Sequence, residues 1–580
     1  MTWKSVENLL LASFLLSLAA WIGFCFWFPL TDTDIWWHLA SARWMVEHRS
    51  FLFVDPFCLA SLGQPWTDLH WGFQLAVYTL WTIGGAWLLI LVKVLCMVSM
   101  VGLVFWSQWQ KRSIAYLTPV AALGAYPIRL LVDVRPLMFT LVLLALQYAL
   151  VMGYFRSRQI RWLVFLLPCQ CLLVNIQGLY LLGPFLVSCF AVQEWVQNRR
   201  HKGKTSWTPL MGMALVLGFM GFASPYGWKG FALPFALFGR IAPVPGNIFS
   251  AEIAENQPLL SLFRQDPYAV LPLFLGFILV LYSFDKNRRA FSLGHALIFA
   301  AFTALGVMAQ RNLPIAFLGG LMAIAYNLRH IHSADQQVMP SPAATHPRPP
   351  LRITSASRSW LLGGLALAAI DGIYAPSILH AWRFELPGSL VTPFRFPENA
   401  VQFLRRNPIP GQVFNELRYG GYMDYALFPD KLTFIDGRMI LRDAGFYRRF
   451  LRAVDEPEYF RDYRQTYGIT HAVLPISEDK RFLPLAAWLI RSGHWSLLFC
   501  DGAGVVLASE EIRPDLALTL KHFPEDHPIL IEIKRRFGSH PELLRIATGN
   551  AEEFLAMALG KPVDLDEAGE EVSGSGTKSR

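Results

Sequence analysis

The sequence contains a series of long apolar runs separated by short polar loops, and these runs restrict the possible folds more than any other feature. A helix of about 20 apolar residues is long enough to cross the hydrocarbon core of a bilayer. Roughly eleven runs approach or reach that length, near residues 9–29, 84–107, 114–127, 137–155, 162–174, 178–196, 208–223, 267–284, 291–308, 313–328 and 359–375. Several are short, which is typical of bundles that line a water-filled cavity at membrane depth. The expected fold class is therefore a polytopic α-helical membrane protein.

Composition and charge support this fold class. Hydrophobic residues make up 54% of the 580 residues and charged residues 16%, whereas soluble globular domains contain about 25% charged residues. The net charge of +9 does not indicate a nucleic-acid partner, because the basic residues are concentrated in alternate loops. We therefore expect the bilayer, and no nucleic acid, as the surroundings of this chain.

The distribution of charge predicts the orientation. Sixteen Lys and Arg residues and only two acids, Asp285 and Asp335, lie in five loops, at 111–112, 156–161, 199–204, 285–289 and about 329–358. Eight basic and nine acidic residues lie in the alternating loops, at about 30–70, 128–136, 175–177, 224–266 and 309–314. The positive-inside rule places the first set in the cytoplasm. We therefore expect a cytoplasmic N-terminus and an extracytoplasmic C-terminal domain.

Composition also divides the chain into segments. The apolar core of the first run continues past "SLAA", which favours an uncleaved first span over a signal peptide. We expect a transmembrane domain at 1–375 with an outer loop at 30–70, and a Pro/Ser-rich cytoplasmic linker at 331–358. From 376 to 512 the sequence predicts an α/β domain, with strands in "GQVFNE", "KLTFID", "THAVLP" and "GAGVVLAS". A helical segment and a disordered acidic tail are expected over 513–580.

Polar residues gather at the predicted outer ends of the spans. Ionisable groups at this depth are costly, so they mark a site or pair with one another. The residues concerned are Asp32, Asp34, His38, Asp55, Asp68, His70, Arg129, Asp133, Arg135, Asn175, Gln177, Tyr226, Arg311 and Asn312. This clustering on one side argues against a transporter, which would place polar groups in mid-bilayer.

Structural interpretations of these residues remain open beside the functional ones. Thr31 or Asp32 suits the N-cap of a helix that begins with "IWWHLA", and Trp36 and Trp37 suit interfacial anchors as well as sugar stacking. His38 lies one helical turn after Asp34, where it can accompany that carboxylate as a hydrogen-bond partner or a metal ligand.

Two arginines and two cysteines are equally ambiguous. Arg129 and Arg135 suit snorkelling, a pair with Asp133, or phosphate binding. Cys58 and Cys500 fall on the predicted outer side, where a disulfide is compatible with their positions. The "CQC" at 169–171 has no flanking partners and favours apolar packing over metal binding.

The outer α/β domain contains a second group of polar residues. In "FIDGR", Asp436 and Arg438 suit an ordinary turn with a local ion pair, or a lid that contacts the sugar or acceptor together with Asn415 and Glu416. The two glycines of "NELRYGGY" indicate a tight turn or a close backbone approach.

Two stretches carry a family resemblance. The segments "DTDIWWHL" and "DPF…GQPWTDLHWGFQLAVYTLWTIGG" resemble the GT-C superfamily of membrane glycosyltransferases. Within it, they resemble a bacterial group related to protein mannosyltransferases and to the aminoarabinose transferase that acts on lipid A. The resemblance is best over the first ~110 residues, and "GGYMDYALFP…KLTFIDGR" is similar to the outer domain of that group.

The resemblance implies a function and a location. Asp34 matches the aspartate that activates the acceptor. The next position, commonly acidic in relatives, is Ile35 here, and the second acid is Asp32. Asp68 and His70 match a second polar cluster. The implied reaction is an inverting transfer of a hexosyl or pentosyl group from a polyprenyl-phosphate donor to a lipid, polysaccharide or protein acceptor outside the bacterial inner membrane.

Each candidate residue then has an expected role. Asp34 and Asp32 are the catalytic candidates, and Arg129, Arg135 and Arg311 are expected to hold the donor phosphate. A divalent ion is compatible with the site, with Asp32 and His38 as its ligands. The expected substrate-binding residues are His38, Asp68, His70, Tyr226, Asn312, Asp436 and Arg438. Two alternatives remain: a non-catalytic envelope-assembly protein and a transporter of lipid-linked precursors.

Overall fold

The computed structural model describes residues 3–200, 206–241, 244, 246–337, 355–386, 388–478 and 480–565. These residues form two compact units. The first contains the described residues of Met1–Phe28 and Asp68–Ala381, and the second contains those of Pro29–Thr67 and Trp382–Arg580. The second unit is therefore assembled from two separate stretches of the chain.

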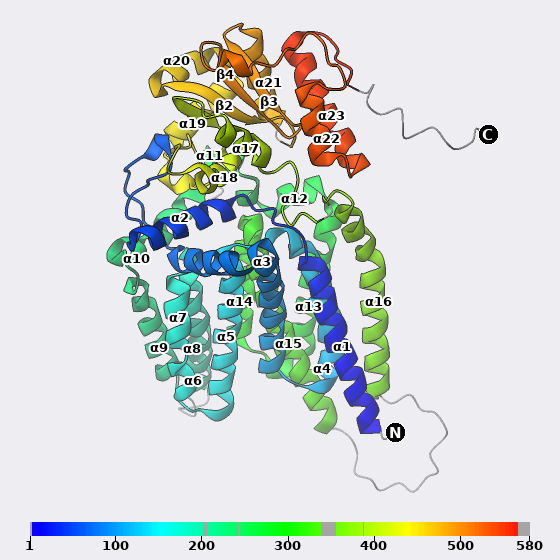
Figure 1. Cartoon of the computed structure of the whole chain (residues 1–580). Coiled ribbons are helices and arrows are strands. Elements are labelled where there is room, and N and C mark those ends of the chain that lie inside the picture. The colour runs from blue at the N-terminus through cyan, green and yellow to red at the C-terminus, as the bar shows by residue number, and fades with distance from the viewer. Residues whose placement is uncertain are drawn as a thin grey trace, which may run out of the picture. The chain divides into compact units, whose positions relative to one another are not determined.

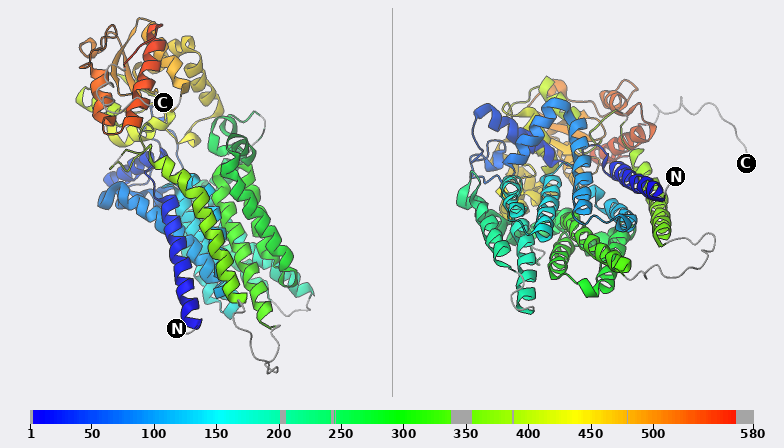
Figure 2. Two further views of the ribbon diagram at one scale, coloured as in Figure 1. Left: turned by 90° about the vertical axis from the view of Figure 1, so that its right-hand side faces the viewer. Right: turned by 90° about the horizontal axis from the view of Figure 1, so that it is seen from below.

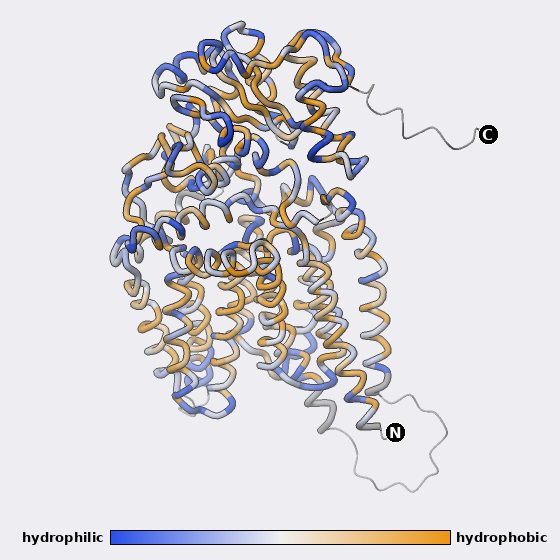
Figure 3. The backbone as a smooth tube through the Cα atoms, in the orientation of Figure 1, coloured by the Kyte–Doolittle hydropathy of each residue, from blue (hydrophilic) through white to orange (hydrophobic). Residues whose placement is uncertain are grey.

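The first unit is a bundle of helices (Figures 1 and 2). Its longer helices are α1 (Trp3–Phe26), α3 (Trp71–Ser107), α4 (Lys111–Ile128), α5 (Pro136–Ser157), α8 (Leu182–Arg200), α13 (Pro267–Lys286), α14 (Leu293–Met308), α15 (Leu313–Gln337) and α16 (Ser355–Trp382). Its shorter helices are α6 (Arg161–Val164), α7 (Leu166–Val174), α9 (Thr208–Phe219), α10 (Gly227–Ile241), α11 (Ile248–Glu252) and α12 (Leu259–Gln265). The bundle is mostly apolar along its length (Figure 3).

Most of the apolar runs identified in the sequence lie in helices of this bundle, although the run at 162–174 is divided between α6 and α7 and the run at 208–223 continues past the end of α9. Among the described residues, six helices are long and apolar enough to cross a membrane, and the bent pair Thr208–Phe222 and Gly227–Gly239 would add a seventh. The expected number of about eleven is therefore not confirmed. Helices such as Arg161–Val174 and Leu293–Met308 are apolar but shorter, which is why counting apolar runs gave a larger number.

Helix α3 is two helices joined at Gly85. That residue has φ 57° and ψ −149°, a conformation that glycine adopts without the steric penalty of a Cβ. Figure 1 shows the two parts of α3 running in different directions. Gly85 therefore separates the aromatic stretch that begins at Trp71 from the apolar span that ends at Ser107.

The second unit contains a four-stranded sheet with the order β1-β2-β4-β3. The strands are β1 (Gln412–Asn415), β2 (Ile469–Pro475), β3 (Trp495–Cys500) and β4 (Gly504–Ser509). Strand β1 is parallel to β2, and the other neighbours are antiparallel. The accompanying helices are α17 (Glu398–Arg406), α18 (Leu417–Leu427), α19 (Ala444–Asp455), α20 (Pro457–Tyr467), α21 (Leu483–Arg491), α22 (Pro528–Phe537) and α23 (Pro541–Leu559).

Some local expectations for this unit were wrong. The stretch "KLTFID" is not a strand, and only Thr433 within it makes an isolated bridge, to Cys58. The two glycines of "NELRYGGY", Gly420 and Gly421, lie inside helix α18 rather than in a turn. A Cβ on Gly420 would collide with the carbonyl oxygen of Ile435, so the expected close backbone approach is present.

The ends of the expected linker at 331–358 are helical. Helix α15 continues to Gln337 and α16 begins at Ser355. The rest of the linker and the acidic tail beyond residue 565 lie outside the described residues.

The outer loop at 29–67 is part of the second unit, although it lies between two helices of the first unit in sequence. It contains α2 (Asp34–His48). Leu30 bridges to Val391 and Cys58 bridges to Thr433, both in the parallel sense. A Cβ on Gly421 would lie 3.0 Å from the carbonyl oxygen of Thr33, so α18 approaches the start of α2 closely.

Candidate functional site

The two aspartates of "DTD" have different environments. Helix α2 begins at Asp34, and Thr33 at its N-cap position makes no side-chain capping bond. Instead, the backbone N–H of Asp34 donates to Asp32 Oδ1 at 3.1 Å. Asp32 is 5% exposed, and Asp34 is only partly buried. Asp32 therefore stabilises the start of the helix, as one structural interpretation predicted, and Asp34 is the more accessible carboxylate.

Asp34 lies against the turn of "FIDGR". A Cβ on Gly437 would collide with Asp34 Oδ1 and would lie 3.4 Å from the Nε1 atom of Trp37. Only a residue without a side chain leaves room for the carboxylate here. Gly437 therefore allows Asp34 to lie next to the turn formed by Asp436 and Arg438. These two segments are separated by about 400 residues in the sequence.

A buried charge cluster lies beneath this turn. We use this name for Asp55, Cys58, Asp424, Asp436 and Arg438, all of which are buried. Arg438 Nη2 pairs with Asp55 Oδ1 at 2.8 Å, and Arg438 Nε pairs with Asp436 Oδ2. The guanidinium also lies over the ring of Trp66, 4.6 Å from the ring centroid. The local Asp436–Arg438 pair predicted from sequence is therefore present, within a larger network that ties the outer loop to the α/β domain.

Burial and charge set the protonation of this cluster. Burial, followed by the charge of Asp436, raises the pKa of Asp424 well above its ordinary value. For Asp436, burial acts in the opposite direction to Arg438 and Arg442, and these guanidinium groups keep its pKa low. Asp424 is therefore the protonated partner of the two, and its Oδ1 accepts from the Thr433 hydroxyl at 2.6 Å. Burial also raises the pKa of Cys58, so its sulfur remains a thiol.

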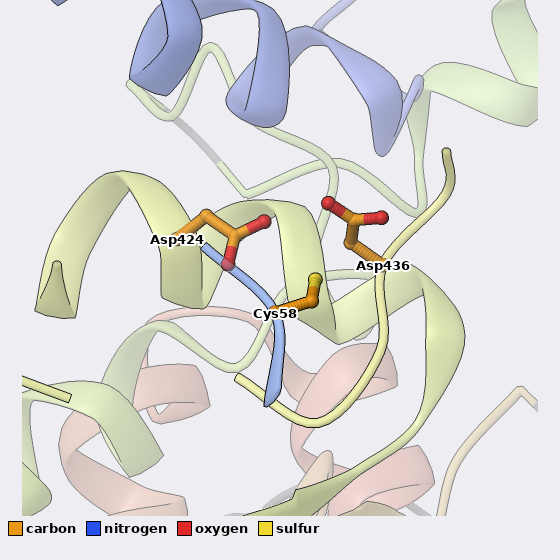
Figure 4. Close-up of side chains that lie close together, drawn as sticks. All are labelled: Cys58, Asp424 and Asp436. Atoms are coloured by element: carbon orange, nitrogen blue, oxygen red, sulfur yellow. The ribbon is translucent and has the colours of Figure 1, made fainter. Parts of the chain in front are cut away.

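Three of these side chains have the spacing of metal ligands. The ligand atoms of Cys58, Asp424 and Asp436 lie within 4.8 Å of one another (Figure 4). However, Arg438 Nη2 lies 3.5 Å from the Cys58 sulfur and Asp436 already pairs with this guanidinium. A divalent ion here would face a fixed positive charge and a protonated thiol, whereas metal ions require deprotonated ligands. The cluster does not fit a metal ion, and neither Asp32 nor His38 belongs to it.

Arg442 is a candidate site residue that the sequence gave little reason to select. It is 2% exposed, and none of its three guanidinium nitrogens has a hydrogen-bond partner among the described residues. Its charge contributes to the low pKa of Asp436. A buried guanidinium without hydrogen bonds is costly, and an anion with several acceptor oxygens would satisfy it. The only sequence signal was an arginine in a short polar stretch directly after "FIDGR".

Other side chains near the start of α2 and α18 are buried or form caps. Trp36 packs against Phe396 and Tyr422, with ring centroids 5.6 Å and 4.8 Å away. His38 is 2% exposed beside Trp37. The side chain of Glu416 caps α18 by accepting from the backbone of Arg418 and Tyr419. A large aromatic core therefore holds the start of α2, and Trp36 is not at a surface where it would act as an interfacial anchor.

Asn415 and the two cysteines also have structural positions. The amide nitrogen of Asn415 donates to the carbonyl oxygen of Ile435 at 2.7 Å, and its oxygen accepts from the backbone of Phe434 at 2.7 Å. Asn415 therefore holds the segment that leads into the "FIDGR" turn. Cys58 and Cys500 are both free and buried, so the disulfide considered from sequence is absent.

In the first unit, Asp68 and His70 form a turn before α3. The backbone N–H of His70 donates to Asp68 Oδ1 at 3.0 Å, and His70 Nδ1 lies 3.6 Å from the same oxygen. Trp71 Nε1 donates to Asn175 Oδ1 at 2.9 Å. Asn175 in turn donates to the carbonyl oxygen of Ala223 at 2.8 Å. The "TDLHW" segment is thereby joined to the segment just before Tyr226.

Asp133 pairs with a residue that the sequence analysis did not select. Lys93 Nζ lies 3.1 Å from Asp133 Oδ1, and both side chains are buried. The lysine also lies over the ring of Phe28, 3.3 Å from its centroid. Lys93 is therefore a partner of Asp133 that the alternatives considered from the sequence, Arg129 and Arg135, did not include. Lys93 lies within an apolar run, where a single lysine gives no indication of its partner.

The three candidate phosphate-binding arginines lie at turns of the bundle. Arg129 lies over the Tyr126 ring, 5.3 Å from its centroid. Arg135 Nη1 pairs with Glu255 Oε1 at 2.6 Å. The backbone of Gln310, next to Arg311, donates to the carbonyl oxygen of Gln257 at 3.0 Å. Segment 254–257 therefore links the region of Arg135 with the "QRN" turn, in which Asn312 donates to the carbonyl oxygen of Leu305 at 3.2 Å.

Known proteins were compared with this chain by sequence and by structure. No family model and no curated protein matches the sequence. The oligosaccharyltransferase of Archaeoglobus fulgidus, tethered to an acceptor peptide, aligns with a TM-score of 0.52 and 13% identity, over 84% of this chain and 71% of that chain. The same archaeal enzyme, AglB, in complex with an inhibitory peptide and a dolichol-phosphate, aligns with a TM-score of 0.51 and 13% identity, over 97% and 85% of the two chains.

The chain therefore has the fold of this archaeal oligosaccharyltransferase. The GT-C resemblance that the sequence suggested is thus confirmed for the fold. Identities of 13% do not transfer the activity or site residues of those enzymes to this chain. Within the GT-C fold of this chain, the first outer loop places Asp34 at the "FIDGR" turn.

Proposed function

We propose that this chain is a membrane glycosyltransferase that moves a hexosyl or pentosyl group from a polyprenyl-phosphate donor to an extracytoplasmic acceptor. The acceptor is a lipid, a polysaccharide or a protein. One observation carries the proposal: a chain with the GT-C fold holds an accessible aspartate, Asp34, at the start of the first outer helix, beside a turn that contains a glycine and a buried arginine.

Asp34 is the proposed general base. Its carboxylate takes the proton of the acceptor hydroxyl, the acceptor oxygen bonds to the anomeric carbon, and the bond from that carbon to the donor phosphate breaks. The lipid phosphate leaves with the electron pair. Because the acceptor enters opposite the leaving phosphate, the configuration of the sugar carbon inverts. Asp32 supports this role by bonding to the backbone of Asp34.

Arginines would stabilise the negative charge on the departing phosphate. The candidates are Arg129, Arg135 and Arg311, of which Arg135 also pairs with Glu255. Arg442 is added to this group because its buried guanidinium lacks hydrogen-bond partners among the described residues. The proposed leaving group, a lipid phosphate, is of the same chemical class as the dolichol-phosphate that is bound to the archaeal AglB. The proposed substrate contacts are those of His38, Asp68, His70, Tyr226, Asn312, Asp436 and Arg438.

No step of the proposal runs through a metal ion. The buried charge cluster already contains the guanidinium of Arg438. This cation balances the negative charge of the carboxylates, which a metal ion would otherwise balance. A chelator is nevertheless part of the experiment, because Asp32 and His38 were expected as metal ligands.

The test is sugar transfer in reconstituted membranes. The full chain is supplied with a panel of radiolabelled polyprenyl-phosphate sugars and with membrane lipid, polysaccharide or peptide acceptors, with and without chelator. We expect release of lipid phosphate by the wild type and a loss of at least 10²-fold with Asp34→Asn, the scale of general-base removal. Asp462→Asn, in an exposed position on α20, is the matched control and should retain activity.

The two alternatives predict other results. A non-catalytic envelope-assembly protein would give no transfer with any donor, and Asp34→Asn would unfold at the same temperature and complement growth as well as the wild type. A transporter would move the labelled donor across the membrane without cleaving it, and Asp34→Asn would not abolish that movement.

A further inference from the structure

Helix α10 follows α9 after a sharp change of direction. The helical stretches Thr208–Phe222 and Gly227–Gly239 are bent by 105° at the short break between them. If the first stretch crosses the bilayer, the second runs close to the plane of the membrane. A re-entrant loop and a helix that lies in the outer leaflet both have this geometry, and the two faces of α10 distinguish between them.

One face of α10 packs against the bundle. The Tyr180 hydroxyl donates to the carbonyl oxygen of Phe231 at 3.0 Å. A Cβ on Gly178 would lie 3.7 Å from Leu237 and 4.0 Å from Pro234, so these two side chains are in contact with the segment before α8. The face that carries Pro234 and Leu237 is therefore held in place by its own unit.

A second face of α10 is apolar and exposed. Trp228 is 67% exposed, Phe235 58% and Phe238 55%, and their spacing places the three rings on one side of the helix. A helix that borders water has polar residues on its exposed side. A contiguous exposed apolar surface instead indicates a binding partner or a membrane. A re-entrant loop would enclose these rings within the protein.

This exposed face continues the lipid-facing side of α9. Leu215 and Phe219 on α9 are both exposed. Phe222, at the end of that stretch, stacks on Phe231 with ring centroids 4.4 Å apart and an angle of 5° between the ring planes. The ring of Trp228 lies 5.5 Å from that of Phe231. One apolar surface therefore runs from the membrane-spanning helix around the bend and onto α10.

The length of the first stretch sets the depth of α10. At 1.5 Å per residue, Thr208–Phe222 is about 22 Å long, which is about 8 Å less than the hydrocarbon core of a bilayer. Amphipathic helices in the membrane plane bury their apolar face about 5–10 Å into the boundary between headgroups and acyl chains. Loop charges predict that the Thr208 end faces the cytoplasm, which places α10 in the outer leaflet.

We propose that α10 lies in the plane of the outer leaflet and binds phospholipid, with Trp228, Phe235 and Phe238 among the acyl chains. Lys229 is exposed beside Trp228, and its long side chain reaches the headgroup phosphates. The bound lipid covers the apolar surface that the bundle leaves open. The helix also anchors Tyr226, which precedes it directly in the sequence, at the level of the headgroups. This anchor does not depend on glycosyl transfer.

Spin labelling of the full chain in liposomes tests the proposal. Single labels are attached to Phe235→Cys and Phe238→Cys in a Cys171→Ser background, since Cys171 is exposed and the other cysteines are buried. Leu215→Cys on α9 is the reference for hydrocarbon, and Glu458→Cys, whose side chain is 71% exposed, is the reference for water. Molecular oxygen collides with labels in hydrocarbon, whereas nickel ethylenediaminediacetate collides with labels in water.

We expect oxygen to relax the labels at Phe235 and Phe238 several-fold more than the nickel complex does, with a ratio between those of the two references. A ratio equal to that at Glu458 would place α10 in water and would overturn the proposal. Weak relaxation by both reagents would show that protein covers this face, either the bundle itself, a second copy or another chain. That result would also overturn the proposal.

Fluorescence provides a second measurement that needs no label. Trp228→Phe keeps an aromatic ring, so the fold should be retained, and the wild-type spectrum minus that of the variant is the contribution of Trp228. In liposomes of brominated phosphatidylcholine, we expect this contribution to be quenched several-fold more by bromine near the glycerol end of the chains than by bromine near the methyl end. Absence of quenching by either lipid would contradict a position of Trp228 in the leaflet.

Discussion

The guanidinium groups of Arg438 and Arg442 lie in the same turn of the second unit but are satisfied very differently. Arg438 pairs with Asp55 and Asp436, and removing one partner of such a buried network costs about 3–5 kcal/mol. Arg442 is as deeply buried and has no hydrogen-bond partner among the described residues. Arg438 is thus fixed in place by its ion pairs, whereas the guanidinium of Arg442 is available to bind an anion.

Arg442→Gln tests this distinction. Because the guanidinium makes no hydrogen bond that holds the fold together, we expect the unfolding temperature to stay the same or rise. If Arg442 binds the phosphate of the sugar donor, the rate of sugar transfer should fall about 10²-fold. This is the effect of removing one hydrogen-bond donor that stabilises a charged transition state. Thermal unfolding and the transfer assay are measured on the same preparation. A lower unfolding temperature with normal transfer would assign Arg442 to the fold instead.

The protonated state of Asp424 gives a prediction about pH. Its folded pKa is raised by burial, so the folded protein holds a proton that the unfolded chain loses above pH ~4. Stability from this proton is complete at low pH and is lost as pH rises towards the folded pKa. Asp424→Asn removes this titration and keeps the size of the side chain. Relative to the variant, wild-type stability should fall by about 1.4 kcal/mol per pH unit in that range.

The measurement compares the unfolding temperatures of the wild type and of Asp424→Asn between pH 5 and pH 8. The difference between variant and wild type should widen as pH rises. Parallel curves would mean that Asp424 is ionised in the folded protein.

At the scale of elements, the close packing of α18 on the 434–438 segment and on α2 positions Asp34. Gly420 faces the backbone of Ile435, and Gly421 faces the backbone of Thr33. A helix interior usually disfavours glycine by about 1 kcal/mol relative to alanine. Here the missing side chains let three backbone segments meet.

Gly420→Ala should therefore destabilise the second unit in spite of its better helix propensity. The added methyl group would collide with the carbonyl oxygen of Ile435, and such overpacking costs about 1–3 kcal/mol. Gly549→Ala in α23 is the control, because nothing lies within 4 Å of its Cβ position. It should be neutral or stabilising by up to about 1 kcal/mol. Equal unfolding temperatures for the two variants would contradict the packing argument.

Sequence patterns predicted the elements whose signal is local. The strands β1, β2 and β4 were all expected, and so was a helical segment after residue 512, where α22 and α23 lie. The stretch "KLTFID" has the residues of a strand, but its partners are Cys58 of the outer loop and the side chain of Asn415, so no ladder forms. Strand β3 was missed because its short sequence gives little indication of a strand. Its pairing with β4 stabilises the strand in the structure.

Site residues were predictable where they were polar and close to "DTD" or "FIDGR". Lys93 was missed because its significance depends on Asp133, which is far away in the sequence. Arg442 was missed because its significance depends on the lack of hydrogen-bond partners among the described residues. The helical bundle was predictable from hydropathy, while the membership of residues 29–67 in the second unit required tertiary contacts.

At the scale of the whole molecule, loop charges predict the orientation of the chain. Cys171 is the one exposed cysteine of the seven, so a Cys171→Ser background suits labelling. In intact cells, a membrane-impermeant thiol reagent should label Glu458→Cys, whose side chain is 71% exposed, and should label Arg289→Cys only after permeabilisation. The reverse pattern would invert the positive-inside assignment.

The discontinuity of the second unit affects the order of synthesis. Residues 29–67 leave the ribosome early, but the chain that completes their unit begins only at Trp382. At about 5–20 residues per second, the intervening residues 68–381 take roughly 15–60 s to appear. During that time Asp55 has no Arg438, and the aromatic side of α2 has no partner from α18. The new loop therefore remains without the rest of its unit until the residues from 382 onward have been synthesised.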